Sequence, residues 1–355
     1  MLMAAGGGFL ASNVSATAQI RRICPFPSSI ISPRGTGAAR RWNPNSLPVI
    51  SVATEPKSPA NSPTLADRVR LGGLTEDGLS YEERIIVRSY EVGPNKTITI
   101  QIIASYLQDI ACNHFLSLGY TTDDGFSTTN SMRKLNLILV LSRMHIELYK
   151  YPAWNDVIEI EAWVHIEGNM GFRRQWIIKD YSTGEVIGRA TGKWLLMHQE
   201  TRRFHKVVSE IVDECQIFTS NVPRYAFPDE NKAWLKKIEK IDESYHYSKH
   251  RLEPRRTDVD MNDHLNYVTY IGWILESISE IINGYELQSL TIDFRQECRL
   301  GDIIDSLAIR ESSDDHHEHN VNDGLLRFRH SLRRLSSNGS ETTRARTVWR
   351  KKTEK

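Results

Sequence analysis

The sequence predicts an α+β protein in which one unit, a long buried helix wrapped by a curved antiparallel sheet, occurs twice in tandem. Three observations predict it: a repeated strand motif, a second repeated motif upstream of it, and a long apolar segment in front of each copy. Length agrees, because 355 residues exceed the size at which a single hydrophobic core usually stops growing.

The clearest repeat is the pattern G-x4-R-A-x3-W, which occurs twice, 155 residues apart. Its two copies stand at Gly184, Arg189, Ala190 and Trp194, and at Gly339, Arg344, Ala345 and Trp349. Each copy follows a turn between two alternating stretches, as expected of a β-hairpin. A second, weaker repeat relates residues 154–162 to residues 300–308 at a shift of 146. Two motifs in the same order indicate a duplicated unit.

A long apolar segment precedes each copy, at residues 98–118 and 265–282. In the second segment the apolar positions cover most of a helix circumference, which indicates a helix buried on most sides. No apolar run approaches the roughly 18 residues of a membrane span, so we expect protein to enclose this helix. The alternating strands predicted to do so are residues 289–295, 303–309, 325–335 and 342–350. A helix followed by several strands indicates a hotdog fold, here as a tandem double hotdog.

The first 54 residues differ in composition from the rest. They contain five arginines, no lysine and no acidic residue before Glu55. Such an acid-free, serine-rich leader is typical of an organelle transit peptide, although a plain disordered tail remains the alternative. The expected organisation is a transit peptide at 1–54, a disordered linker at 55–79, an N-terminal unit at 80–205, a connector at 206–245 and a C-terminal unit at 246–352.

Charge and cysteine content exclude several classes of protein. The net charge is +1, and removing the leader with its five arginines leaves −4, whereas a nucleic-acid binder normally keeps a basic excess. The four cysteines are too few and too scattered for a disulfide framework, and no C-x-x-C pair suggests zinc. The stretch with His316, His317 and His319 is interpreted as a solvated hairpin tip. We therefore expect no nucleic acid, no metal and no membrane span.

The sharpest polar motif, D-V-D-M-N-D-H-L-N, ends directly before the second apolar helix. Within it Asp260, Asn262 and His264 alternate, so in an extended segment their side chains would point the same way. A structural interpretation is also open, because Asn262 and Asp263 would make a good helix N-cap. Backbone N–H groups at a helix start can stabilise a developing oxyanion. The corresponding stretch of the first unit, Y-E-V-G-P-N-K, has no histidine, so we expect the chemistry in the second unit.

Downstream, the motif F-R-Q-E-C ends a predicted strand. In it Glu297 is a candidate general base for water and Cys298 a candidate nucleophile. Each has a simpler interpretation, since a glutamate at a strand end is usually solvated and a cysteine is usually a small buried hydrophobe. The two are consecutive on an extended strand and should face opposite sides, so only one can face His264. We favour Glu297 and leave the cysteine mechanism open.

Longer motifs resemble the plant acyl-acyl-carrier-protein thioesterases. They are M-R-K-L, R-M-H-I-E-L-Y-K-Y-P-A-W-N-D-V-I-E-I-E, K-D-Y-S-T-G-E-V-I-G-R-A-T, D-M-N-D-H-L-N-Y-V-T-Y-I-G-W-I-L-E-S, F-R-Q-E-C and R-A-R-T-V-W-R-K-K. The resemblance covers about residues 78–352. It favours the oleoyl-preferring FatA type, because of E-L-Q-S-L-T-I-D-F-R-Q-E-C and because the apolar anchor of the other plant type is missing.

This resemblance implies hydrolysis of the thioester that joins a long fatty acyl chain to its carrier, in the plastid stroma, without metal or cofactor. The catalytic set that it implies is Asp260, Asn262, His264 and Glu297, with Cys298 as the nucleophile of the alternative mechanism. It makes the leader a plastid transit peptide. The first unit is expected to hold the acyl chain, because only the second retains the polar motif.

The partner that the resemblance implies is acyl carrier protein with a phosphopantetheine-linked chain. An acidic carrier would need local basic patches, and the candidates are Lys232, Lys236, Lys237 and Lys240 on the connector, Arg133 and Lys134, and Arg202 and Arg203. Two other functions stay open on the same scaffold, a non-hydrolytic acyl-chain binding protein and a hotdog dehydratase. A homodimer is also left open.

Overall fold

The computed structural model describes residues 65–120, 128–220, 222–242, 244–260, 264–311, 324–336 and 339–352. The predicted leader, the candidate residue Asn262 and the stretch with His316, His317 and His319 lie outside the described residues. None of the described helices is both long enough and apolar enough to cross a membrane.

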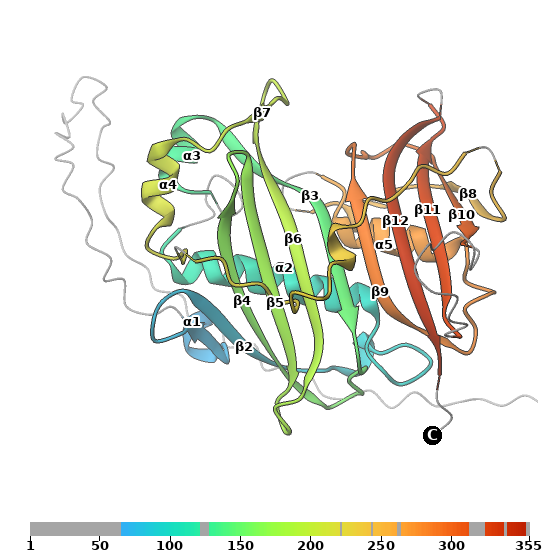
Figure 1. Cartoon of the computed structure of the whole chain (residues 1–355), viewed down its shortest axis with the longest axis horizontal. Helices are drawn as coiled ribbons and strands as arrows, with labels where there is room; N and C mark the ends of the chain where they lie inside the picture. The colour runs from blue at the N-terminus through green and yellow to red at the C-terminus, as the bar shows by residue number, and fades with distance from the viewer. Residues whose placement is uncertain are drawn as a thin grey trace, which may run out of the picture. The chain divides into compact units, whose positions relative to one another are not determined.

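The described strands form one continuous antiparallel sheet (Figure 1). Its order is β1-β2-β4-β5-β6-β3-β9-β12-β11-β10-β8, with β7 beside β6. The strands are β1 (Gly72–Leu74), β2 (Ser80–Ile86), β3 (Leu137–Leu148), β4 (Val157–Glu167), β5 (Gly171–Asp180), β6 (Val186–His198), β7 (Phe204–His205), β8 (Tyr247–Leu252), β9 (Tyr285–Phe294), β10 (Ile304–Arg310), β11 (Leu326–Arg334) and β12 (Ser340–Lys351). The first half of the chain supplies β1 to β7 and the second half β8 to β12.

Two long helices, α2 (Ile100–Ser117) and α5 (Tyr267–Glu276), pack against one face of this sheet and against each other (Figure 1). Fully buried apolar side chains recur every three or four positions along both helices, among them Ile103, Leu107 and Ile110 of α2 and Ile271 and Ile274 of α5. The shorter helices are α1 (Leu65–Val69), α3 (Asn130–Lys134), α4 (Ser209–Cys215) and the 3-10 turns η1 (Ser89–Glu91), η2 (Ala233–Leu235) and η3 (Arg256–Asp258). The predicted tandem double hotdog is confirmed.

The start and end of α5 differ from the sequence prediction. The N-cap is Asn266, whose side chain accepts a hydrogen bond from the backbone N–H of Val268 (3.0 Å). The interpretation of Asn262 and Asp263 as the cap is therefore wrong, because the helix begins four residues later. The helix ends at Glu276, and a series of turns follows, so the apolar pattern overestimated its length.

Both repeated motifs adopt matching local structures in the two halves. Gly184 (φ 73°) and Gly339 (φ 71°) take the left-handed conformation in the hairpin turns before β6 and β12, where a glycine avoids the clash of a Cβ atom. In the second motif, Asn155 (φ 71°) and Gly301 (φ 88°) take the same conformation before β4 and β10. The structure therefore confirms the duplication.

The two halves join where β3 pairs with β9. His145 lies opposite Thr291, and its Nδ1 is 2.7 Å from the threonine Oγ1. Arg143 lies opposite Asp293 and forms an ion pair with it (3.4 Å). Because the pairing continues the sheet across the junction, both long helices share one buried face.

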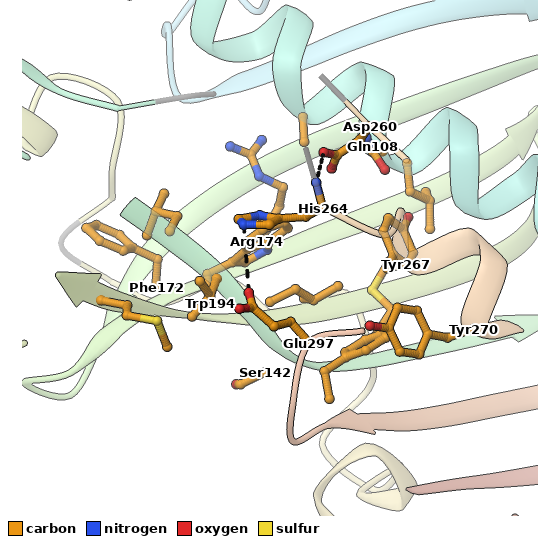
Figure 2. Close-up of a pocket in the computed structure, with 18 of the residues that line it drawn as sticks. Gln108, Ser142, Phe172, Arg174, Trp194, Asp260, His264, Tyr267, Tyr270 and Glu297 are labelled. Atoms are coloured by element: carbon orange, nitrogen blue, oxygen red, sulfur yellow. Dashed lines mark hydrogen bonds and ion pairs between the residues drawn. The ribbon is translucent and has the colours of Figure 1, made fainter. Parts of the chain in front are cut away.

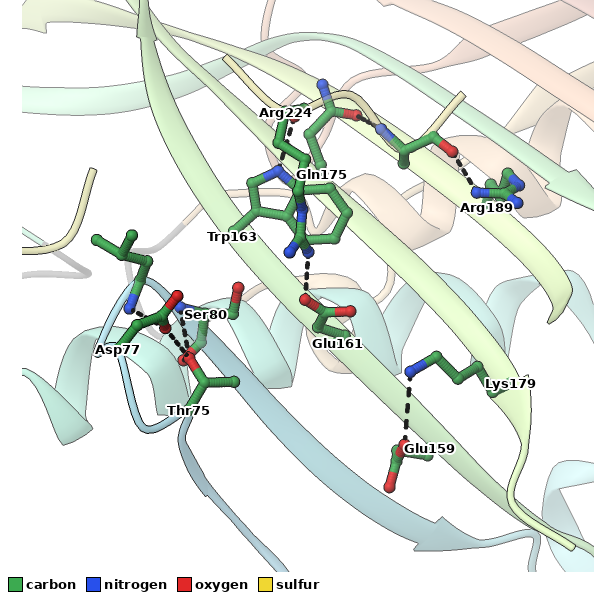
Figure 3. A network of polar contacts seen from close by, with 12 residues as sticks. Thr75, Asp77, Ser80, Glu159, Glu161, Trp163, Gln175, Lys179, Arg189 and Arg224 are labelled. Atoms are coloured by element: carbon green, nitrogen blue, oxygen red, sulfur yellow. Dashed lines mark hydrogen bonds and ion pairs between the residues drawn. The ribbon is translucent and has the colours of Figure 1, made fainter. Parts of the chain in front are cut away.

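The connector after β7 covers the outer face of the first half's sheet (Figure 3). The Arg224 guanidinium lies 3.5 Å from the centre of the Trp163 ring and pairs with Glu161, while the Trp163 Nε1–H donates to the Arg224 carbonyl (2.8 Å). Beside the connector lysines the chain forms a single 3-10 turn, η2.

Candidate functional site

A cavity of about 530 Å³ lies between α2 and the sheet of the first half and reaches the start of α5 (Figure 2). Most of its wall is apolar and comes from the first half, including Leu107, Ala111, Phe115, Met144, Phe172 and Trp194. Three of the predicted site residues line it as well, and they are Asp260, His264 and Glu297. An apolar cavity with a few convergent polar groups is the usual form of a small-molecule site.

Asp260 and His264 lie in a tight loop between η3 and α5. The backbone N–H of Asp260 donates to the His264 carbonyl (2.8 Å), and the Asp260 carboxylate accepts from the backbone N–H of His264 (3.2 Å). Val259 and Leu265 form an isolated antiparallel bridge at the base of the loop. The chain thus folds back here, and the expected extended segment is wrong. The carboxylate of Asp260 holds the main chain of His264 and so helps to set the position of the imidazole.

Glu297 approaches this loop from the turn after β9. Its Oε2 lies 3.7 Å from the His264 Nε2, and Figure 2 shows the two side chains facing each other. Arg202 donates to the same Oε2, and Arg299 donates to Oε1 (2.7 Å). Burial acts to raise the pKa of Glu297, but the hydrogen bond from Arg299 and the charges of Arg202 and His264 outweigh it. The pKa therefore lies below its usual range, and Glu297 is ionised at neutral pH.

Cys298 faces away from the cavity. Its side chain is 1% exposed and belongs to the apolar core around α5, while its backbone N–H donates to the Tyr270 hydroxyl (2.8 Å). Burial raises the pKa of the thiol, whereas a nucleophilic cysteine needs a lowered one. The prediction that Glu297 and Cys298 face opposite sides is confirmed. The place of Asn262 in the site stays a prediction, because that residue lies outside the described part.

Sequence reasoning missed the residues that hold Glu297. Arg202 follows β6 in the first half, 95 residues from Glu297, and was interpreted only as part of a basic patch. No local pattern signals such a contact, because it depends on how the two halves pack. Arg299, two residues after Glu297, was also passed over, although an i, i+2 pair in a turn can bring a cation to a carboxylate. The site is therefore built from both halves.

Comparison with known proteins gives two successive family matches. Residues 78–215 match the acyl-ACP thioesterase N-terminal domain, and residues 241–351 match the acyl-ACP thioesterase C-terminal domain. The chloroplastic oleoyl-acyl carrier protein thioesterase 1 of Arabidopsis thaliana is 54% identical over 81% of each chain. The chloroplastic palmitoyl-acyl carrier protein thioesterase of Gossypium hirsutum is 37% identical, over 83% of this chain and 69% of its own.

Solved structures agree with the family matches. The 12:0-ACP thioesterase from Umbellularia californica is 33% identical, with a TM-score of 0.69 over 78% of this chain and 95% of its own. An acyl-ACP thioesterase from Bacteroides thetaiotaomicron is 20% identical, with a TM-score of 0.58 over 78% of this chain and 100% of its own. Because the Bacteroides thetaiotaomicron protein is only 20% identical, its likeness to this chain supports the fold alone.

Proposed function

Because the chain belongs to the acyl-ACP thioesterase family, we propose that it hydrolyses long-chain acyl-acyl carrier protein, with oleoyl as the preferred chain, to free fatty acid and carrier protein. The observation that carries this proposal is one cavity that joins an apolar wall to the His264–Glu297 pair. The wall suits the alkyl chain, and the pair suits the activation of water. Family membership favours hydrolysis over the binding-protein and dehydratase alternatives.

In the proposed mechanism Glu297 and His264 act on the attacking water. Glu297, kept ionised by Arg202 and Arg299, takes a proton from a water that His264 helps to orient. The water oxygen bonds to the thioester carbon, and the carbonyl becomes an oxyanion. When this intermediate collapses, the carbon–sulfur bond breaks, and Glu297 gives the proton that it took from water to the departing thiolate. Asp260 acts as a positioning residue through the main chain of His264.

The oxyanion is assigned to the start of α5. The backbone N–H of Leu265 has no hydrogen-bond partner among the described residues, and Leu265 lines the cavity next to His264. With Asn262 as a second donor, this N–H would stabilise the developing charge, and one such donor contributes about 3 kcal/mol to the barrier reduction. The second half would thus supply the chemistry and the first half the acyl pocket.

A pair of variants of the full-length protein tests the mechanism. Glu297→Gln keeps the size of the side chain but cannot take a proton, so we expect kcat for oleoyl-carrier hydrolysis to fall by at least about 100-fold. Cys298→Ala should retain most of the activity, because the thiol lies in the core. If Cys298→Ala is inactive and the wild type shows a burst of acyl-enzyme, the cysteine mechanism is correct and this proposal is wrong. A panel of carrier-bound chains from 8 to 18 carbons measures the chain preference.

We also place the protein in the plastid stroma, with residues 1–54 as a transit peptide. The relatives above that are named chloroplastic and the acid-free leader support this placement. A fluorescent reporter fused behind residues 1–60 should collect in chloroplasts, and a diffuse cytosolic signal would contradict the proposal. For the carrier protein we favour the patch at Arg202 and Arg203, which lies beside Glu297. A homodimer stays a prediction, which sedimentation velocity tests.

A further inference from the structure

Arg334, the last residue of β11, contacts the turn that carries Glu297. Its Nη2 donates to the main-chain carbonyl of Glu297 (2.5 Å), and its Nε forms an ion pair with the Asp302 carboxylate (3.2 Å). The Arg334 side chain is 18% exposed and lines the cavity together with His264 and Glu297. The mechanism above gives Arg334 no role. Because it binds the main chain of the proposed general base, its contacts bear on where that base lies.

Asp302 closes the same turn from its other end. Its Oδ2, which faces Arg334, also accepts a hydrogen bond from the backbone N–H of Arg299 (2.8 Å). The backbone N–H of Asp302 in turn donates to the Arg299 carbonyl (3.1 Å). Hydrogen bonds that involve a charged group are stronger than those between neutral groups. Arg334 and Asp302 thus join the end of β11 to both ends of the turn.

The turn that follows β3, 146 residues earlier, is the counterpart of this turn in the first half. In each copy two successive backbone N–H groups donate to one carbonyl, that of Ile187 in the first half and that of Thr342 in the second. Asp156 accepts from the backbone N–H of Ala153 (2.8 Å), as Asp302 does from its own turn. The two turns therefore share these main-chain contacts and the aspartate.

The residue at the end of the neighbouring strand differs between the halves. Asp180 of β5 lies opposite Ile158, and Arg334 of β11 lies opposite Ile304, which is the matching position. Asp180 forms an ion pair with Lys150 (3.4 Å). An ionised carboxylate only accepts hydrogen bonds, so Asp180 cannot hold a carbonyl of its turn as Arg334 does.

The turn of the first half is supported from another side. The backbone N–H of Ile98, in the loop before α2, donates to the Pro152 carbonyl (2.9 Å), and an isolated antiparallel bridge lies beside this bond. In the second half, the described residues of the loop before α5 form no main-chain hydrogen bond with the turn. The cavity reaches both segments there, since His264 from the loop and Glu297 from the turn line it.

An open side between loop and turn leaves room for the thioester, but the turn that carries the base then lacks the support that its counterpart has. We propose that Arg334 is a positioning residue that replaces this support: it holds the main chain of Glu297, so that the carboxylate stays within reach of His264 and of the attacking water. A displacement of about 1 Å in a reacting geometry can cost about 100-fold in rate. This inference rests on the proposed thioesterase function.

The first test compares the full-length wild type with Arg334→Met on carrier-bound oleoyl. The variant loses the donor to the Glu297 carbonyl, so we expect kcat to fall by about tenfold while KM changes by less than about twofold, as when an interaction of the transition state is removed. A rise in KM with an unchanged kcat would mean that Arg334 binds the substrate instead, and would overturn the proposal.

The second test separates positioning from stability. A glutamine at position 297 cannot take a proton, so its exact place matters little to the residual reaction. We therefore expect Arg334→Met to lower kcat by no more than about twofold when it is added to Glu297→Gln. A folding defect would lower the activity by the same factor in both backgrounds. Equal losses in the two backgrounds would therefore overturn the proposal.

Asp180→Asn is the matched control, because it changes the charge at the equivalent strand end of the first half. It should keep kcat within about twofold. Asp302→Asn keeps an acceptor for the turn but loses the charge that faces Arg334, and kcat should fall by about threefold. A loss in Asp180→Asn as large as that in Arg334→Met would overturn the proposal. A wild type that releases no fatty acid from any carrier-bound chain would refute the thioesterase function, and this role with it.

Discussion

The loops in front of the two long helices, residues 92–98 and 259–265, are closed by matching main-chain contacts and differ in their side chains. Each follows a 3-10 turn and is closed by an isolated antiparallel bridge between its end residues. In the first loop the backbone N–H of Gly93 donates to the Thr97 carbonyl (2.9 Å), as Asp260 donates to His264 (2.8 Å) in the second. The described residues of the two loops therefore correspond at a shift of 167.

The first loop is sealed by a main-chain hydrogen bond that has no counterpart among the described residues of the second. The Ile98 N–H donates to the Pro152 carbonyl (2.9 Å), so the start of α2 presents no unused donor there. In the second half, the equivalent bond would join Leu265 to Cys298, and the described residues contain no such bond. The N–H group of Ile98 is thus satisfied by the main chain, whereas that of Leu265 has no hydrogen-bond partner among the described residues.

The side chains that lie next to the two loops also differ between the halves. Glu297 occupies the position that Tyr151 has in the first half, 146 residues earlier, and the Tyr151 hydroxyl donates to the Leu287 carbonyl at 2.8 Å. The difference teaches that the duplication kept the main-chain contacts that close this loop, while the second copy gained polar side chains that meet, as His264 and Glu297 do. Four sets of variants test this comparison.

The largest effect is expected from His264→Ala. Loss of the imidazole that faces Glu297 should lower kcat by about 10² to 10⁴-fold, as steady-state hydrolysis of oleoyl-carrier protein measures. The matched variant Thr97→Ala alters the equivalent residue of the sealed loop and should keep activity within about twofold, because surface-type substitutions cost little. Comparable losses in both variants would mean that the first loop also takes part in catalysis.

Asp260→Gly places the first loop's residue in the second loop. It removes the carboxylate that accepts from the His264 N–H, a contact worth about 1 kcal/mol, so we expect kcat to fall by about fivefold to tenfold with little change in KM. Asp260→Asn keeps an acceptor oxygen and should restore most of the loss. If Asn and Gly variants behave alike, the charge of Asp260 matters rather than its bond to the backbone.

The two helices should also respond differently to added volume. Ala111 of α2 lines the cavity, so Ala111→Leu should shorten the space for the alkyl chain and lower the ratio of 18-carbon to 12-carbon products by about fivefold, at a stability cost of about 1 to 3 kcal/mol. Gly272 of α5 has no atom within 4 Å of an added Cβ. Gly272→Ala should leave the product profile unchanged and stabilise the protein by about 1 kcal/mol. Chromatography of the released acids and thermal unfolding measure these outcomes.

The smallest effect concerns pH. Burial raises the pKa of Glu297, and Arg299, Arg202 and His264 together bring it below the usual range. Removing one cation raises that pKa, so in Arg202→Met the acid limb of the kcat/KM profile should move to higher pH. Arg203→Met changes an exposed neighbour and should leave the limb in place. An unmoved limb in Arg202→Met would show that another group controls it.

Much of the fold could be predicted, because its signals are local. The helix pattern, the alternating strands and the left-handed glycines at Gly184 and Gly339 depend on residues a few positions apart. The end of α5 at Glu276 could not, since Ile278 beyond it is equally apolar and buried. The spacing of apolar residues reports which side chains are buried. Because side chains in the turns after α5 are buried too, this spacing does not show where the helix ends.

The candidate site was predicted in part for the same reason. Asp260 and His264 stand in one short motif, and Glu297 was found because the fold brings a strand end to a helix start. The ion pair of Glu297 with Arg202 depends on segments far apart in the sequence. Contacts of this kind carry no periodicity, so only the folded chain displays them.

The pairing of β3 with β9 also determines how the halves stay together. Each half alone would expose one of these strands as an unpaired edge, and such edges recruit other chains. Because a single polypeptide carries both strands, their pairing is intramolecular, and its effective concentration does not change on dilution. Each copy could then diverge without having to recognise an identical partner. A tethered pair can thus keep one loop that carries a histidine and one sealed loop, which an exchangeable pair of identical subunits cannot.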